Sequence, residues 1–460
     1  MSLHPAPSFS PADRLLIGLA CALTFVWSLP DLIALRIGLA LLLLGTAAWR
    51  AITTRSSAQT TATASPGQHR SATILYGILT LWVLLQAGVW GLNPAGDFKE
   101  IWGQWIRSGL VGLAGVLLAT TVLRSPRPQA GARLACALLA TLAALVALHD
   151  GDTVWRWLQL GYFPFQQIRI VENRTVLSYV ANLVLAFLCA ETVARLLHRR
   201  AYLPIPSAGL ATLFALSLFC TYALGTRNGT LGILGLLASS TFVVWFAKRK
   251  AVSVGLQAGT LAVVLAGIAA FGWATFKSDP RWQAFQATVV VAWDTEHQAA
   301  WKDPELPYPP LPDGTPAEGS AYLRLAWGKE AIQAIAAYPL GVGFGRSAFG
   351  QAMRQVYPDY RSTEHSHSGI LDFTLGVGLP GLALWLAFLG TLGVHGWRAF
   401  FVRENPAGLL LLFLVTGYFS RSLVDSNIRD HMLEQFMFLA GVLTVLARED
   451  LHRSDAHDAG

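Results

Sequence analysis

Charged residues are scarce in this sequence, and the shortage excludes a soluble protein. Only 13% of the 460 residues are Asp, Glu, Lys or Arg, whereas 53% are hydrophobic. The apolar residues form repeated runs close to the roughly 20 residues that a helix needs to cross a bilayer. We therefore predict an all-α, polytopic helical membrane protein.

Cysteines are scarce too, and none stands in a loop. Cys21, Cys136, Cys189 and Cys220 all lie inside apolar runs. This placement argues against disulfides and against a zinc cluster, both of which need cysteines that converge from exposed segments. We interpret the four thiols as small packing residues.

The formal charge of +7 does not indicate a nucleic-acid partner, because Lys and Arg cluster in short loops between apolar runs. That distribution is typical of proteins oriented in a membrane by their cytoplasmic charges, so membrane lipids are the expected surroundings. The segment Met1 to Asp13 has no basic region, and no small-residue cleavage site closes the first apolar run before Pro30. We expect this run to be kept as a membrane span.

About twelve transmembrane helices are expected, with both termini in the cytoplasm because the basic loops alternate. Asn93 to Ile101, the short turn at Gly225 to Gly229 and one loop of about ninety residues then face the opposite side. The predicted spans are 14–29, 32–49, 72–91, 104–123, 132–149, 175–196, 205–224, 229–247, 252–276, 368–394, 407–420 and 431–447.

We expect one membrane-embedded domain over residues 1–460, with a large loop on the outer side at 278–367 and a cytoplasmic linker at 50–71. In the large loop, the Pro-rich stretch from Asp303 to Pro316 predicts irregular structure. Helical periodicity returns at Ala321 to Tyr338 and predicts an amphipathic helix that lies on the membrane or caps a cavity. Its expected apolar face is formed by Tyr322, Leu325, Ala326, Ile332 and Ile335.

The segment Glu364-His365-Ser366-His367-Ser368-Gly369 joins the large loop to an apolar run. Histidine can exchange a proton near neutral pH, so at this boundary it is a candidate for general-base chemistry. With Glu364, the two histidines could instead bind a metal, although the sequence offers no further ligand at a recognisable spacing. A third interpretation is that both are polar residues at a membrane interface.

Arginines on the same predicted side are candidates for binding an anion. Arg227 lies in a very short turn between apolar helices, and its planar guanidinium matches phosphate oxygens in pairs. The alternative is that it extends to lipid headgroups. Arg324 lies near the start of the amphipathic helix, and Arg174 precedes another apolar run.

Three further patterns have plainer explanations. Arg421 and Asp425 are candidate substrate contacts, but their i, i+4 spacing favours a structural ion pair. The Gly-rich run from Pro339 to Gly345 imitates a phosphate loop, yet no strand precedes it, so we interpret it as a turn. Gly376, Gly378 and Gly381 beside Pro380 predict close helix packing and a kink.

These residues resemble the O-antigen ligases, a family grouped with O-antigen polymerases and protein O-oligosaccharyltransferases. The ligase pattern is a histidine followed by Asn, Ser or Gln, nine residues, glycine, two residues, and Gly, Thr or Tyr. His367-Ser368, Gly378 and Gly381 fit that pattern. The resemblance implies that His367 is the functional histidine and that Arg227 and Arg324 are the functional arginines.

The resemblance further implies an enzyme of the bacterial inner membrane whose active site faces the periplasm. It would transfer O-antigen from an undecaprenyl-pyrophosphate donor to the lipid A-core oligosaccharide, with inversion and with neither metal nor cofactor. Independently of the resemblance, Arg174, His365, Arg421 and Asp425 are candidate substrate contacts. The alternatives are a polymerase or protein O-oligosaccharyltransferase of the same family and, outside the class, a solute transporter. A transporter more often has internal repeats and charges at mid-membrane.

Overall fold

The computed structural model describes residues 9–55, 67–124, 129–198, 201–248 and 285–449, with isolated positions between 259 and 273. Within this part of the chain the regular elements are helices, accompanied by an isolated bridge between Pro310 and Pro316. The expected all-α fold is confirmed. The membrane-region helices are α1 (Pro11–Val26), α2 (Ile33–Arg55), α3 (Gly67–Val89), α4 (Pro94–Glu100), the π-helix η1 (Ile101–Ile106), α5 (Arg107–Leu123), α6 (Ala130–Leu160), α7 (Arg174–His198), α8 (Ser207–Leu224), α9 (Arg227–Lys248), α15 (Gly369–Arg403), α16 (Ala407–Ser422) and α17 (Asp430–Leu446).

Eight helices of the described ranges are long and apolar enough to cross a membrane, when α4, η1 and α5 are taken as one continuous helix. Helices α1, α16 and α17 are shorter, at 16, 16 and 17 residues. Helices occupy every expected span except 252–276, of which the structure describes only isolated positions. The chain is a polytopic membrane protein.

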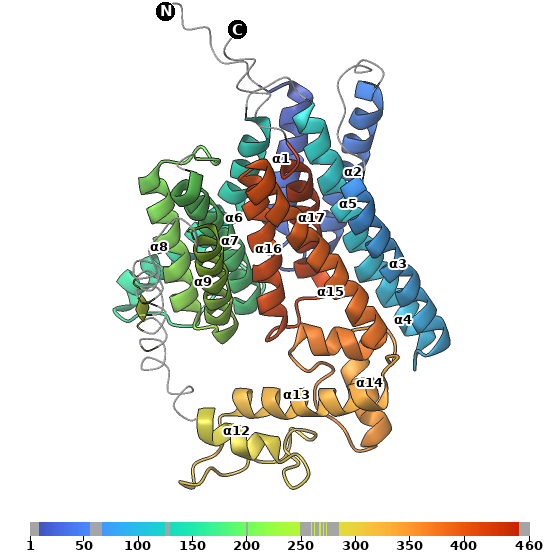
Figure 1. The fold of residues 1–460 in the computed structure, drawn as a ribbon. Helices are drawn as coiled ribbons and strands as arrows, with labels where there is room; N and C mark the ends of the chain where they lie inside the picture. Colours follow the sequence, from blue (N-terminus) through green and yellow to red (C-terminus); the bar gives the residue numbers. More distant parts are fainter. Residues whose placement is uncertain are drawn as a thin grey trace, which may run out of the picture.

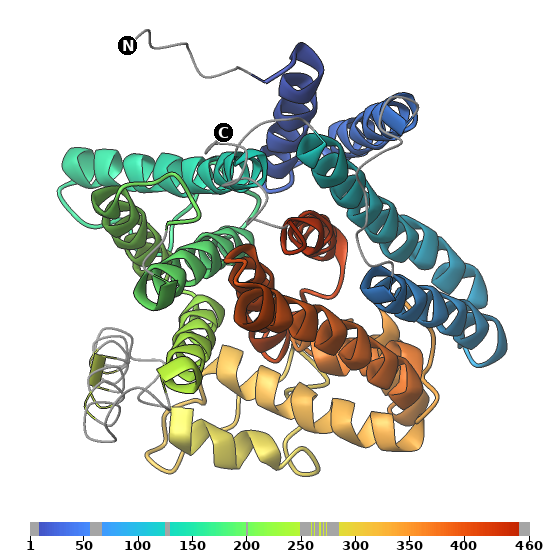
Figure 2. The same cartoon turned by 45° about the horizontal axis from the view of Figure 1, so that its top comes forward.

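Helix α17 lies at the centre of the bundle, surrounded by the other helices (Figure 2). Its close neighbour is α5, and glycines permit the approach. A Cβ added to Gly115 would lie 2.4 Å from the carbonyl oxygen of Phe438, and one added to Gly441 would lie 2.3 Å from that of Gly112. Small residues at such crossings let backbones approach closely, which drives helix association in lipid.

The large loop folds into α12 (Phe285–Trp293), α13 (Gly319–Ala337) and α14 (Ala348–Val356). Figure 1 shows α13 lying across one end of the bundle, opposite the end where α1 begins. Trp301, Tyr322, Trp327 and Phe349 form a small core beneath it. The loop is therefore a folded cap on the bundle rather than a disordered connection.

The buried face of α13 differs from the predicted one. Tyr322 and Ala326 are buried as expected, but Ile332 is 53% exposed. Glu330 is buried instead and accepts a 3.0 Å hydrogen bond from the Tyr357 hydroxyl. Glu330 can point inward because the loop core supplies the Tyr357 hydroxyl as its hydrogen-bond donor. A hydrophobic pattern in the sequence cannot show such a donor.

Helix α15 is kinked as the sequence predicts. Gly378 has φ 74° and ψ 175° and lies two residues before Pro380. The run from Pro339 to Gly345 packs against this kink, where the Val342 and Gly343 amides donate to the Leu375 and Gly376 carbonyls at 2.9 and 3.0 Å. This run is a docking turn and not a phosphate loop, and it holds the end of α13 against α15.

Helices enter both ends of the expected linker at 50–71. Helix α2 continues to Arg55 and α3 begins at Gly67. The intervening residues 56–66 lie outside the described part of the chain. The segment between α2 and α3 is therefore shorter than the linker predicted from the sequence.

Candidate active site

Three arginines that are far apart in the sequence line one pocket. Arg174 begins α7, Arg227 begins α9, and Arg324 lies in the second turn of α13. The pocket contains about 450 Å³, including space open to solvent. Of the described residues, its other lining members are neutral: Thr175, Gly225, Thr226, Asn228 and Ser320. We call it the arginine pocket.

A tight turn places Arg227 in the arginine pocket. Helix α8 ends at Leu224, and Gly225 takes the left-handed conformation with φ 56°. A Cβ at Gly225 would lie 2.6 Å from Phe165 Cζ, so both the conformation and the space require glycine. The backbone then re-enters a helix at Arg227, whose amide end adds positive potential to the pocket.

Polar neighbours orient the three guanidinium groups. Arg324 Nη1 donates to Asn228 Oδ1 at 3.1 Å, and Arg174 Nη1 donates to Gln166 Oε1 at 2.6 Å. Arg227 Nη2 lies 3.1 Å from Glu318 Oε2. That carboxylate also caps α13 by accepting from the Ala321 amide at 2.7 Å. The pocket thus has a positive excess, which suits an anion.

His367 lies next to the arginine pocket. Its ring stacks on Trp327 with centroids 5.3 Å apart, and Trp327 is one turn from Arg324 on α13. His365 meets the same imidazole edge-on at 4.3 Å. His367 takes φ 64°, and the next residue, Ser368, caps α15 by accepting from the Leu371 amide. The turn that starts α15 therefore presents His367 to α13.

Burial, followed in order of effect by the neighbouring His365, Arg324 and Arg429, lowers the pKa of His367 to about 3. Desolvation disfavours the charged imidazolium, and nearby positive charge does the same. The pKa of His365 is also lowered, first by burial and then by Arg429. Both imidazoles are therefore neutral at physiological pH, the form that can accept a proton.

The geometry does not favour Glu364, His365 and His367 as a metal site. Arg354 binds the Glu364 carboxylate through two hydrogen bonds of 2.8 and 3.0 Å. His365 Nδ1 lies 3.3 Å from the Thr363 hydroxyl. In the part of the chain that the structure describes, these three residues do not form a group of closely spaced metal donors.

Arg421 and Asp425 lie behind the pocket wall and not at its surface. Arg421 Nε donates to Asp425 Oδ2 at 2.8 Å, and its other nitrogens donate to Ser178 Oγ at 3.2 Å and to the Thr175 carbonyl at 2.8 Å. The Arg421 side chain is 1% exposed. These contacts tie α16 to the start of α7, so they favour the ion-pair interpretation over a substrate contact.

Sequence reasoning missed the side chains that orient the predicted ones. Glu318, Asn228, Gln166 and Trp327 each contact a candidate residue through space. Only two of these had a signal in the sequence, since Asn228 follows Arg227 and Trp327 lies three residues after Arg324. The others come from segments that only the fold brings near.

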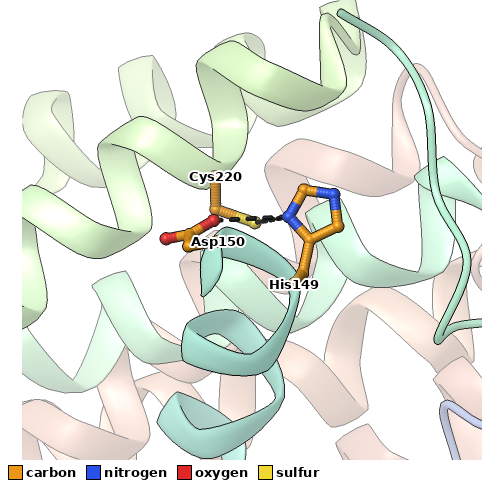
Figure 3. A group of neighbouring side chains, drawn as sticks. All are labelled: His149, Asp150 and Cys220. Carbon is orange, nitrogen blue, oxygen red and sulfur yellow. Dashed lines mark hydrogen bonds and ion pairs between the residues drawn. The ribbon is translucent and has the colours of Figure 1, made fainter. Parts of the chain in front are cut away.

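A second polar cluster lies between α6 and α8 (Figure 3). His149 Nδ1 is 3.3 Å from Asp150 Oδ1 and 3.9 Å from Cys220 Sγ, and all three residues are buried. These donor atoms lie within 4.8 Å of one another, close enough to share an ion. However, a metal-bound histidine normally donates its second ring N–H to a partner, and His149 Nε2 has no hydrogen-bond partner among the described residues. We assign the cluster to packing between α6 and α8, so Cys220 contacts polar groups as well as apolar ones.

The fold and this site define a polytopic membrane protein with an arginine-lined pocket beside a neutral histidine. Residues 212–386 match the family model of O-antigen ligase. Over this segment the chain is therefore similar to the O-antigen ligase family, whose members are membrane glycosyltransferases. The segment includes Arg227, Arg324, His365 and His367. No curated protein matches the chain.

Proposed function

We propose that the protein transfers O-antigen polysaccharide from undecaprenyl pyrophosphate to the lipid A-core oligosaccharide at the periplasmic face of the bacterial inner membrane. The observation that best supports this proposal is the convergence of Arg174, Arg227 and Arg324 on one pocket. Guanidinium groups bind phosphate oxygens in pairs, so the arginine pocket suits the donor pyrophosphate. In this proposal Arg174 and His365 contact substrate, while Arg421 and Asp425 support the pocket wall.

In the proposed reaction, an acceptor hydroxyl oxygen forms a bond to C1 of the first donor sugar. The bond between C1 and the pyrophosphate oxygen breaks, and its electron pair leaves with the pyrophosphate. Arg227 and Arg324 stabilise that negative charge as it develops. The hydroxyl proton passes to His367, and this single displacement inverts the anomeric centre.

The low pKa of His367 implies that the donor binds before the proton is transferred. In the free protein the imidazole is neutral but holds a proton weakly, because burial, His365 and Arg324 all lower its pKa. A bound pyrophosphate places negative charge beside Arg324 and opposes its field. The base is therefore stronger in the donor complex than in the free protein, so donor binding favours proton transfer.

The test is transfer by purified protein, with lipid-linked O-antigen and lipid A-core as substrates, in excess chelator and without a nucleoside triphosphate. We expect full activity, because the leaving group is already activated and arginines supply the positive charge. Activity that is lost in chelator, restored by one divalent ion and absent in Cys220→Ser would assign a metal to the His149 cluster and contradict this scheme.

The products separate a ligase from a polymerase of the same family. A strain lacking the protein should lose all O-antigen from lipopolysaccharide while its lipid-linked polymer keeps normal length. A single repeat unit attached to the core would indicate a polymerase instead. Restoration by the wild-type chain, but not by Arg227→Ala, would assign that phenotype to the arginine pocket.

A further inference from the structure

A second and larger pocket opens at the same end of the bundle as the arginine pocket. It contains about 1410 Å³, including space open to solvent. The turn between α1 and α2, the π-helix η1 and the start of α17 form its walls. Figures 1 and 2 show α2 and α4 on the opposite side of the bundle from α9, which holds Arg227. We call this second pocket the lateral groove.

The charges of the lateral groove are balanced, unlike those of the arginine pocket. Its lining has four basic residues (Arg36, Lys99, Arg107, Arg346) and five acidic ones (Asp31, Glu100, Glu172, Asp430, Glu434), a formal balance of 4 − 5 = −1. Three of the four basic residues already pair with carboxylates. Arg107 Nε lies 2.6 Å from Glu434, Arg36 lies 3.6 Å from Glu172, and Arg346 contacts Glu100 and Asp430.

Paired charges do not attract a further anion strongly, but they still offer hydrogen-bond donors and acceptors side by side. A sugar hydroxyl needs both, because it donates one hydrogen and accepts through two lone pairs. A phosphate only accepts. The lateral groove therefore suits a polyhydroxylated ligand, whereas the arginine pocket suits pyrophosphate.

The rim of the lateral groove is apolar and aromatic. Trp102 is 72% exposed, and Ile33 and Ile37 are exposed beside it. An indole face can pack against the C–H face of a sugar ring, and tryptophan is favoured where a membrane meets water. This rim lets a ligand with a lipid anchor place its sugar in the groove while its chains stay in the bilayer.

The groove wall contains an unusual backbone element. Trp102, Gly103 and Gln104 belong to η1, a π-helix within the continuous helix from Pro94 to Leu123. π-Helical turns are rare and often occur at functional sites. A Cβ added to Gly103 would meet no atom within 4 Å, so this residue leaves the groove open.

A smaller pocket lies beside the lateral groove, next to the segment that carries the histidines. It shares Gln104 and Arg346 with the groove, and Glu364, Gly369 and Arg429 also line it. Glu364 and Gly369 flank the His-Ser-His segment, and Arg429 is one of the charges that lower the pKa of His367. The His-Ser-His segment therefore lies beside the smaller pocket, and the His367 ring also packs on α13, whose Arg324 lines the arginine pocket.

We propose that the lateral groove binds the oligosaccharide of the membrane-anchored acceptor and leads its hydroxyl to His367. This inference rests on the proposed function, and it assigns the two substrates to opposite sides of one histidine. The donor pyrophosphate binds among unbalanced arginines, and the acceptor sugar binds among paired charges beside Trp102.

Two variants test the lateral groove without touching the arginines or histidines. Gly103→Leu fills open space in the groove, and Trp102→Ala removes the exposed ring. We expect each to raise the acceptor KM at least about tenfold, with donor KM and kcat at saturating acceptor within about twofold of wild type. Trp155→Ala removes a similarly exposed ring on α6 and should change nothing. Unchanged acceptor KM in both variants, or a raised donor KM alone, overturns the proposal.

Direct binding separates failure of this inference from failure of the proposed function. Deacylated core oligosaccharide and inorganic pyrophosphate are titrated by calorimetry into wild-type protein, Gly103→Leu and Arg227→Ala. We expect Gly103→Leu to lose the oligosaccharide and keep pyrophosphate, and Arg227→Ala to do the reverse. Wild-type protein that transfers glycan yet binds oligosaccharide equally well in Gly103→Leu refutes the groove alone. Protein that binds oligosaccharide in the groove but transfers nothing refutes the proposed reaction alone.

Discussion

His367 stacks on Trp327 with ring centroids 5.3 Å apart. This contact joins two parts of the site, because Trp327 lies one turn from Arg324 on α13 while His367 directly precedes α15. Any motion of α13 relative to α15 would change the separation of the candidate base and an arginine. The contact thus makes the loop cap a part of the site as well as its cover.

The first prediction separates the two histidines. If His367 is the base, His367→Ala should lower turnover by about 10² to 10⁴-fold, the usual size of a general-base contribution, and leave donor binding nearly intact. His365→Ala should have a much smaller effect, because that ring packs on its neighbour, contacts Thr363 and is not the proposed base. Transfer kinetics on purified variants provide the measurement. Full activity in His367→Ala, or a larger loss of activity in His365→Ala, would show that His367 is not the base.

The second prediction concerns the arginine pocket. Arg227→Lys and Arg324→Lys should fail almost as badly as the alanine variants, because an ammonium cannot reproduce the planar pair of donors. Arg354→Lys is a matched control, since that arginine pairs with Glu364 at a half-exposed site away from the pocket. Kinetics and donor binding are measured after checking membrane level and folding. Activity of either pocket lysine variant near wild type would show that charge alone is sufficient.

The third prediction is a dependence of stability on pH. The folded pKa of His367 is about 3, below the unfolded value of about 6.5. The unfolded chain therefore binds more protons between these values, so stability falls as pH falls from about 6.5 towards 3. We expect the apparent melting temperature of wild-type protein to drop between pH 7 and pH 5, and that of His367→Gln to drop less. Equal drops in the two proteins would mean that His367 is not held neutral by the fold.

The sequence predicted the parts of this site better than their arrangement. Arg227 and the two histidines could be chosen because each stands where a polar segment meets an apolar run, and Arg324 because it lies near the start of a predicted amphipathic helix. Their convergence could not be predicted, since Arg174, Arg227 and Arg324 belong to three segments that meet only when α13 folds across the bundle. The kink at Gly378 was predictable because glycine beside proline is a local signal.

The hydrophobic pattern of the sequence predicted the buried face of a helix less well where that helix packs on a polar partner. The buried side of α13 includes Glu330 and leaves Ile332 half exposed, which a hydrophobic pattern cannot indicate. The lateral groove was also unpredictable, because residues near 33, 102, 346 and 430 form its walls together. Such a groove depends on long-range packing and on a π-helical turn, neither of which has a clear local signal.

The fourth prediction tests the role of the buried pair Arg421 and Asp425. Arg421→Ala leaves a buried carboxylate without its cation, a change that typically costs about 3–5 kcal/mol. Arg354→Ala breaks a half-exposed pair and should cost only about 0–1 kcal/mol. We expect a large loss of thermal stability in the first variant, a small one in the second, and partial recovery in the double variant Arg421→Met, Asp425→Leu. A stable Arg421→Ala protein with a raised donor KM would assign Arg421 to substrate binding.

The last prediction concerns the side of the membrane. Ser320 lines the arginine pocket in the first turn of α13, and Ser57 lies in the expected cytoplasmic linker, outside the described residues. In a background where the four native cysteines are replaced, Ser320→Cys should react with an impermeant thiol reagent in intact spheroplasts. Ser57→Cys should react only after lysis, because the basic loops are retained in the cytoplasm. Pyrophosphate should slow labelling of Ser320→Cys, since an anion bound by Arg227 and Arg324 would cover that position. The opposite labelling pattern would invert the topology and remove both the arginine pocket and His367 from the periplasm.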